Sequence, residues 1–289
     1  MAHNDEKNAA GGGRFTYQIL SDIHIERDYP KVPDLEKFIE CKSDTLIIAG
    51  DVGRLSGIAY FDQYITFMAK IQESAFKRVI LVLGNHEYMT SRQAGAAPVD
   101  VGEYLFARLH VVLGGFPKIT LLQDSYVDIA TGGGNSNIRI YGTTLWSYIP
   151  DEARVIDGKA VELPIMTFNN RWVEASWFNR EHARCVYSLE LAITKAKQEG
   201  KRMIVVSHYA PTMLKTLDDE HLEDPMHAWY ASNLDRLLTG DQVYVWIFGH
   251  THVNCAYLTK GDTFLVSNQY RAKAGGGNGG VMSMRMPQG

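Results

Sequence analysis

The stretch Val79-Ile80-Leu81-Val82-Leu83-Gly84-Asn85-His86-Glu87 decides the fold class of this chain. It opens with a short apolar run rich in β-branched side chains, which predicts a strand buried on both faces. A glycine and polar residues follow at once. We therefore expect this strand to deliver side chains to a functional site.

The same arrangement recurs elsewhere in the chain. Apolar runs at 17–20, 45–49, 203–206 and 243–248 end in Ser21-Asp22-Ile23-His24, Gly50-Asp51, Ser207-His208 and Gly249-His250-Thr251-His252. We expect all these strand ends to converge on one site. Apolar residues at helical spacing between 58 and 76 predict a helix that joins two of the strands in parallel by a right-handed crossover.

Weaker patterns predict the remaining elements. We expect short helices at 35–39 and 228–238, and a helical region from Pro164 that ends at Gly200. Short strands at 119–122, 126–129 and 138–141 are typical of an antiparallel meander, with a hairpin loop at 132–135. Residues 212–226 form a predicted surface loop, and further strands are expected at 256–258, 263–266 and 281–284, with a glycine-rich loop at 275–280.

Composition indicates an ordinary globular protein. The 289 residues are 45% hydrophobic and 21% charged, with a formal net charge of -4, so nucleic acid is an unlikely partner. We expect one domain over 14–289 after a flexible tail at 1–13, and no membrane span. The scattered Cys41, Cys185 and Cys255 indicate a reducing, cytoplasmic setting without disulfides. The oligomeric state stays open.

Asp and His at the strand ends suggest a metal site. On an extended chain Asp22 and His24 share one face, as do His250 and His252. One such pair by itself is better explained as a capping carboxylate beside a surface histidine. Several buried imidazoles and carboxylates together, however, would cost several kcal/mol without a cation. Their number therefore favours a metal centre.

The ordered motifs Asp22-x-His24, Gly50-Asp51, Gly84-Asn85-His86-Glu87, Ser207-His208 and Gly249-His250-Thr251-His252 resemble those of the calcineurin-like metallophosphoesterases. The likeness spans residues 15 to about 270. It implies an α/β fold of four layers, α/β/β/α, in which a β-sandwich is flanked by helices. The strand pattern alone leaves a single mixed sheet equally open.

The resemblance also implies a dinuclear centre. One divalent ion would be held by Asp22, His24, Asp51 and His252, and the other by Asp51, Asn85, His208 and His250, with Asp51 as the bridge. The centre stays positively charged and would ionise a bridging water for attack on a phosphate ester. His86 would protonate the leaving group, although a structural histidine is the alternative. Mixed Asp, Asn and His ligands suit Mn, Fe or Zn.

Arg54 marks a departure from the family. Many protein phosphatases of the family carry a carboxylate at this position. The carboxylate that commonly orients the catalytic histidine of relatives also has no obvious counterpart here, so what positions His86 is unexplained. Arg54 is a candidate contact for a phosphate oxygen, as is Asn85, and a solvated arginine is the alternative. Glu87 is expected to orient Asn85 or a backbone amide.

The expected function is hydrolysis of a small phosphorylated substrate. A phosphodiesterase acting on nucleotides or nucleic acid is the nearest alternative, and a non-catalytic scaffold of the same fold is a remote one. Residues that can form the substrate wall are Trp146, Tyr148, Tyr209, Trp229, Tyr230, Asn268 and Arg271. Burial in the core is the alternative for the aromatic residues.

Overall fold

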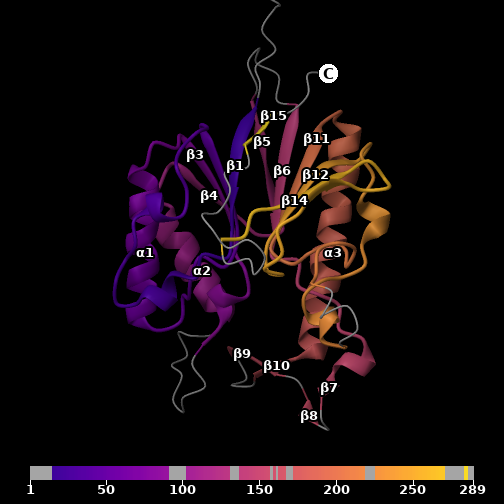
Figure 1. Cartoon of the computed structure of the whole chain (residues 1–289), viewed down its shortest axis with the longest axis horizontal. Coiled ribbons are helices and arrows are strands. Elements are labelled where there is room, and N and C mark those ends of the chain that lie inside the picture. Colours follow the sequence, from indigo (N-terminus) through magenta and orange to yellow (C-terminus); the bar gives the residue numbers. More distant parts are fainter. Residues whose placement is uncertain are drawn as a thin grey trace, which may run out of the picture.

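Two β-sheets pack face to face between layers of helices, as the computed structural model of the chain shows (Figure 1). The structure describes residues 15–90, 102–130, 137–156, 159–160, 162–166, 172–218, 225–270 and 283–285. The four-layer α/β/β/α sandwich implied by the resemblance is confirmed. The expected tail at 1–13, the loops at 132–135 and 275–280, and Arg271 lie outside the described residues.

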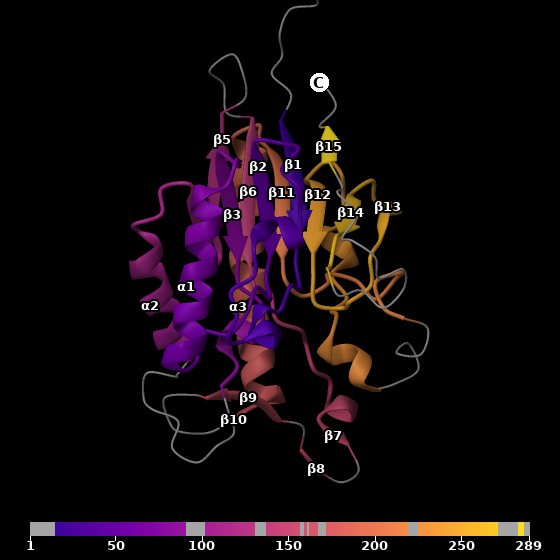
Figure 2. The same ribbon diagram turned by 60° about the vertical axis from the view of Figure 1, so that its left-hand side comes forward.

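The first sheet holds the strands that precede the Asp22, Asp51 and His86 motifs. Its order is β15 (Ser283–Arg285), β1 (Thr16–Leu20), β2 (Thr45–Ala49), β3 (Arg78–Val82) and β4 (Ile119–Leu122). Strands β1 to β4 are parallel and β15 is antiparallel to β1. Helices α1 (Ile58–Glu73) and α2 (Gly102–Leu113) cover its outer face (Figure 2).

The second sheet carries the motifs of His208, His250 and His252. Its order is β13 (Ala256–Leu258), β14 (Phe264–Ser267), β12 (Val243–Phe248), β11 (Arg202–Ser207), β6 (Ile138–Thr143) and β5 (Ser125–Ile129). Helix α3 (Ala175–Gln198) covers its outer face (Figure 1). Two small ribbons, β7 (Val155–Ile156) with β8 (Lys159–Ala160) and β9 (Glu162–Met166) with β10 (Trp172–Glu174), lie below the sandwich in Figure 1.

Single turns of 3-10 helix lie in the connections. They are η1 (Ile25–Asp28), η2 (Leu35–Lys37), η3 (His86–Tyr88), η5 (Asp151–Ala153), η6 (Pro225–Trp229) and η7 (Asp235–Leu237). Helix η1 comes directly after the Asp22-x-His24 motif, and η3 begins at His86 within its motif. They therefore help to shape the site.

Burial on both faces explains why the central strands are continuously apolar. In β2, Ile47 and Ala49 pack between the two sheets, whereas Leu46 and Ile48 belong to the core under the helices. All four side chains have no exposed surface. Each large aliphatic residue buried in this way contributes ~1.5–3 kcal/mol relative to an exposed one, so both sides of the sheet stabilise the sandwich.

The predicted meander is partly wrong. Strand β5 is antiparallel to β6 as expected, but β4 is parallel to β3 and belongs to the other sheet. The chain crosses between the sheets at Asp124, which has φ 49° and accepts a 2.7 Å hydrogen bond from Thr143. The alternation of a short strand reveals which residues share a face, and it does not identify the partner strand.

Two helix predictions need correction, while the helix at 58–76 is confirmed as α1. Residues 228–238 form parts of the 3-10 turns η6 and η7 instead of one helix, because Ala231 between them bridges to Ala210. The helix expected from Pro164 begins only at Ala175, after strands β9 and β10.

The described residues bear on two further expectations, free cysteines and the lack of a membrane-spanning helix. Cys41, Cys185 and Cys255 are all free thiols, as expected. Within the described part of the chain, none of the helices combines the length and the apolar character that crossing a bilayer requires.

Candidate metal centre

The strand-end motifs meet at one edge of the sandwich, where backbone hydrogen bonds tie the loop after β1 to the loop after β2, and the loop after β11 to the loop after β12. The amide of Asp22 donates to Gly50 at 3.1 Å, and that of His24 to Asp51 at 3.1 Å. The amide of Gly249 donates to His208 at 2.9 Å. Loops far apart in the sequence are therefore fixed to one another by the polypeptide itself.

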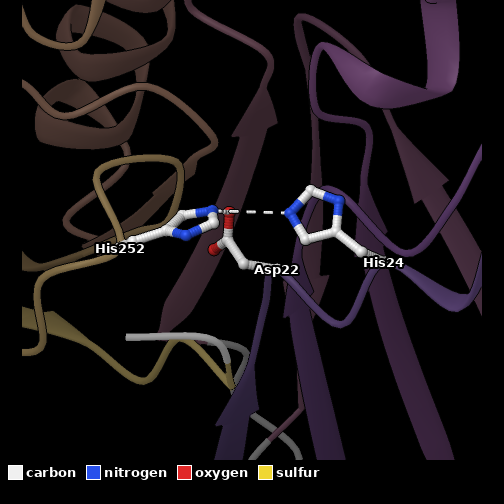
Figure 3. Close-up of side chains that lie close together, drawn as sticks. All are labelled: Asp22, His24 and His252. Atoms are coloured by element: carbon white, nitrogen blue, oxygen red, sulfur yellow. Dashed lines mark hydrogen bonds and ion pairs between the residues drawn. The ribbon is translucent and has the colours of Figure 1, made fainter. Parts of the chain in front are cut away.

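Asp22, His24 and His252 form one group whose ligand atoms lie within 4.8 Å of one another. Figure 3 shows the two rings facing each other, with the Asp22 carboxylate beside them. The Nε2 atoms of His24 and His252 are 3.4 Å apart, and His252 Nε2 is 3.6 Å from Asp22 Oδ1. This group can hold a metal ion.

Asp51, His208 and His250 form a second group within the same 4.8 Å limit. His208 Nε2 lies 3.3 Å from Asp51 Oδ1 and 2.9 Å from Asn85 Oδ1. The other Asp51 oxygen, Oδ2, lies 3.7 Å from His24 Nε2 in the first group. Asp51 thus faces both groups, as a bridging ligand must, and all predicted ligands are brought together. Their roles as ligands stay predictions.

Two glycines make this approach of the loops sterically feasible. Gly50 has φ +88°, and a Cβ on it would lie 2.5 Å from His208 Nδ1. A Cβ on Gly84 would lie 2.2 Å from Asp51 Oδ1. Any larger residue would therefore displace a predicted ligand.

The backbone of the site differs from the expectation. Asp22 and His24 have φ 56° and 49°, and His250 and His252 have φ 70° and 57°. These are left-handed values, so the idea that each pair shares a face of an extended chain is wrong, even though the pairs are correctly brought to the site. Left-handed turns aim both side chains of each loop inward.

In His208 and His250, one ring nitrogen contacts a backbone carbonyl that orients the ring. His208 Nδ1 lies 2.8 Å from the Ala49 carbonyl, and His250 Nε2 lies 3.2 Å from the Trp229 carbonyl. A carbonyl accepts only from a protonated nitrogen, so the opposite nitrogen of each neutral ring keeps its lone pair. Such outer partners are typical of metal-binding histidines. The donor set therefore fits divalent cations.

The buried Asp and His side chains of the centre shift one another's pKa values. Burial raises the pKa of Asp51, but the facing His208 and His86 outweigh it and hold that pKa well below its usual range. Burial lowers the pKa of His208, yet Asp51 raises it to about 9. For His250, burial and His208 together lower the pKa well below its usual range. A cation would have to displace the proton of His208.

His86 occupies the rim, with 22% of its side chain exposed. Its backbone amide donates to Asp51 Oδ1 at 2.8 Å, and its ring nitrogen Nδ1 lies 3.0 Å from Glu26 Oε1. Burial opposes the charged ring, but Asp51 and Glu26 raise the pKa of His86 overall. The ligand atoms of His24, Asp51 and His86 also lie within 4.8 Å of one another, so the assignment of His86 as an acid that binds no metal stays a prediction.

Glu26 is a site residue that the sequence patterns did not reveal. It contacts His86 and also lies 3.2 Å from His24 Nδ1 through the same oxygen. Burial raises the pKa of Glu26, but the two imidazoles lower it to about 2. The available signal was its position two residues after His24, which carries little information without knowledge of the turn that follows.

Glu87 holds two loops together from a fully buried position. Its carboxylate accepts hydrogen bonds from the amides of Asp51 at 3.1 Å, Val52 at 2.7 Å and Gly84 at 2.8 Å. The expectation that Glu87 orients a backbone amide is confirmed. It fixes the loop of Asp51 against the loop that begins at Gly84.

The candidate substrate contacts differ in exposure. Arg54 is partly buried, and its Nε has no hydrogen bond within the described part of the chain. Trp146, Tyr209 and Trp229 are buried, which agrees with the alternative that these aromatic residues belong to the core. Tyr148 is 52% exposed. Asn268 is buried and donates to the Ile19 carbonyl at 2.7 Å, which gives it a bracing contact in the fold.

The fold and the grouped side chains define a metallophosphoesterase architecture, and comparison with known proteins agrees. The family model described as calcineurin-like phosphoesterase matches residues 16–254, so the chain belongs to that family. This membership supports a phosphoester hydrolase.

Individual relatives are distant. An uncharacterized protein, L509, of Acanthamoeba polyphaga mimivirus is 23% identical over 268 residues, which cover 86% of this chain and 89% of the relative. The structure of phosphopantetheinyl hydrolase from Mycobacterium tuberculosis aligns over 90% of both chains with a TM-score of 0.58 and 18% identity. That likeness shows the fold alone.

Proposed function

We propose that this protein is a dinuclear-metal-dependent phosphoesterase that hydrolyses a small phosphorylated substrate, with His86 as the general acid. The observation that carries the proposal is the meeting of two groups of potential ligands at Asp51, whose two oxygens face His208 at 3.3 Å and His24 at 3.7 Å. Family membership supports the same reaction class.

The ligands divide as the resemblance implies. Asp22, His24 and His252 would hold one ion, and Asn85, His208 and His250 the other, with Asp51 shared between them. Bound divalent ions supply positive charge for phosphate oxygens and lower the pKa of water toward ~7. With only two carboxylates among the ligands, the centre keeps a net positive charge that attracts an anionic ester. Mn, Fe and Zn all suit such ligands.

His86 is suited to proton transfer. Asp51 and Glu26 raise its pKa against the effect of burial, which favours the protonated ring that a general acid needs. Its Nδ1 is engaged by Glu26, which leaves Nε2 to donate to a leaving oxygen. Water is then the nucleophile and no covalent phosphoenzyme forms. General acid catalysis of this kind contributes typically ~10²–10⁴-fold.

Substrate recognition rests on few groups of the protein. Arg54 has a partly buried guanidinium whose Nε lacks a hydrogen bond among the described residues, which favours a phosphate contact. Asn85 is the other candidate contact, and the exposed Tyr148 is available to a leaving group. The acidic net charge of -4 favours a small substrate over nucleic acid or an anionic membrane.

Hydrolysis of two aryl esters tests the proposal. We expect the metal-loaded protein to cleave p-nitrophenyl phosphate or bis-p-nitrophenyl phosphate, and the chelated protein to lose that activity. Preference for the diester would favour the phosphodiesterase alternative. A chelated preparation as active as the untreated one would refute metal dependence, and stoichiometric metal with neither ester cleaved would favour the non-catalytic scaffold.

The variant His86→Asn tests the acid. We expect it to retain its metals and to lose ~10²–10⁴-fold in kcat on alkyl esters, with a much smaller loss on aryl esters, whose leaving groups need less protonation. Metal content is measured beside kcat for both ester classes. Equal losses on the two classes would contradict the acid assignment.

A further inference from the structure

Glu26 has an unusual setting for a carboxylate. It lies in η1, directly after the loop of Asp22 and His24, and its side chain is only 8% exposed. No Lys or Arg pairs with it among the residues that the structure describes. Its side-chain contacts run instead to the two imidazoles of His24 and His86.

One oxygen of Glu26 contacts both rings. Oε1 lies 3.2 Å from His24 Nδ1 and 3.0 Å from His86 Nδ1, while Oε2 is buried without a hydrogen-bond partner in the described part of the chain. The rings themselves meet edge to face, with centroids 4.3 Å apart. Because a carboxylate accepts and the Nδ1 positions donate, both rings are held with Nε2 pointing away from Glu26.

The two outward nitrogens face different tasks. His24 Nε2 points to Asp51 at 3.7 Å and to His252 at 3.4 Å, within the first ligand group. His86 belongs to the rim and has the more exposed ring of the pair, 22% against 1%. One acidic side chain thus fixes a predicted ligand and the predicted acid relative to each other.

We propose that Glu26 is the positioning residue for His86, in place of the orienting carboxylate that has no obvious counterpart in the sequence. The inference rests on the proposed function, because it assigns how the acid of that reaction is held. Glu26 reaches His86 from the loop after β1, whereas Arg54 belongs to the loop after β2.

Two variants of Glu26 separate positioning from general damage. Glu26→Met keeps the length of the side chain and removes both acceptors, and Glu26→Gln restores one acceptor oxygen. We expect Glu26→Met to lower kcat on an alkyl phosphate by ~10–100-fold, the usual scale for removing a partner behind a functional histidine, with KM unchanged. Loss on p-nitrophenyl phosphate stays within about 3-fold, because an aryl leaving group needs little protonation. Glu26→Gln recovers part of the loss.

Combination with His86→Asn provides the sharper test. If Glu26 acts through His86, adding Glu26→Met to His86→Asn causes no further loss on the alkyl ester. Because Glu26 also contacts His24, the comparison is made at saturating metal, where metal per chain, measured by mass spectrometry, stays at the wild-type value in both Glu26 variants. Glu40→Gln is the matched control, because Glu40 is 74% exposed and pairs only with Lys42 among the described residues. Multiplicative losses in the double variant, or loss of metal, would assign Glu26 to the metal centre and overturn the proposal.

An NMR readout makes the inference independent of turnover. In zinc-loaded protein labelled with ¹⁵N-histidine, we expect a protected Nδ1 proton for His86 that disappears in Glu26→Met and persists in Glu40→Gln. A wild-type protein that cleaves neither ester would refute the proposed function. An active wild type whose Glu26→Met variant keeps full alkyl esterase activity and the protected proton would refute the role of Glu26 alone.

Discussion

Replacement of Glu87 by glutamine tests whether one buried carboxylate holds the two central loops of the site. Oε1 accepts from the amide of Val52 at 2.7 Å, and Oε2 accepts from Gly84 at 2.8 Å and from Asp51 at 3.1 Å. Glutamine has the same shape but only one acceptor oxygen. Whichever way its amide is turned, an NH₂ group faces an amide N–H.

The magnitude follows from the bonds that are lost. In the better orientation the NH₂ faces Val52, so one short buried bond is lost together with the long contacts from the Gly53 amide at 3.5 Å and the Tyr64 hydroxyl at 3.4 Å. The Val52 donor is left unpaired, which dominates the cost of ~1–3 kcal/mol. At ~2–4 °C per kcal/mol for a domain near this size, the melting temperature falls by about 2–12 °C. Displacement of the Asp51 loop lowers metal affinity by ~10–100-fold.

Thermal unfolding of the chelated protein and competition titration with a chelator measure the two effects at about pH 8. That pH is chosen because burial and the nearby Asp51 raise the pKa of Glu87 to about 7, and the carboxylate is mostly ionised above it. Glu40→Gln serves as the exposed control. The reasoning would be refuted if the melting temperature and the metal affinity of Glu87→Gln stayed within error of the wild-type values. That result would mean that Glu87 is protonated in the wild type, since a protonated carboxyl presents a hydrogen to these donors just as the amide does.

Two further predictions concern single histidines. Burial lowers the pKa of His182, whose Nδ1 donates to the Trp146 carbonyl at 3.0 Å. As pH falls, the unfolded chain therefore takes up a proton near pH ~6.5 before the folded chain does, so this contribution to stability is present above that pH and is lost below it. In urea unfolding of chelated protein, the free energy of unfolding of His182→Gln should depend less on pH between about 7.5 and 5.5 than that of the wild type. An equal dependence on pH in the two proteins would contradict this. His252 has φ 57°, so His252→Gly should be more stable than His252→Ala by ~1 kcal/mol in chelated protein, whereas Thr194 in α3 should show the reverse order. The same order at both positions would argue against strain at His252.

The strand ends were predictable from the sequence because burial on both faces leaves a simple signal. Continuous apolar runs such as 45–49 and 203–206 have few other interpretations when a glycine or serine and a polar residue follow. These runs correctly located β2 and β11, and with them Asp51 and His208. A site built on such strand ends can therefore be located from the amino-acid sequence alone.

The contacts of Glu26 were harder to predict for a physical reason. Glu26 meets His86 across 60 positions of sequence, and that contact depends on how two surface turns approach each other. No periodic pattern records such an approach. The place of β4 was missed similarly, because a four-residue strand offers too few alternating positions to specify its neighbour.

Backbone strain at the site gives an independent reason to expect cations. Five of the predicted ligands, Asp22, His24, Asp51, His250 and His252, have left-handed φ values between 49° and 70°. Left-handed backbone costs roughly 1–2 kcal/mol per non-glycine residue, so together these positions cost about 5–10 kcal/mol, comparable to the whole stability of a typical domain. Such strain persists only where the surroundings over-determine it, and it gathers at functional sites. Ligand bonds to bound cations would offset both this strain and the free-energy cost of burying Asp22 and Asp51. Metal binding therefore accounts for two unfavourable terms that the folded chain would otherwise have to compensate by itself.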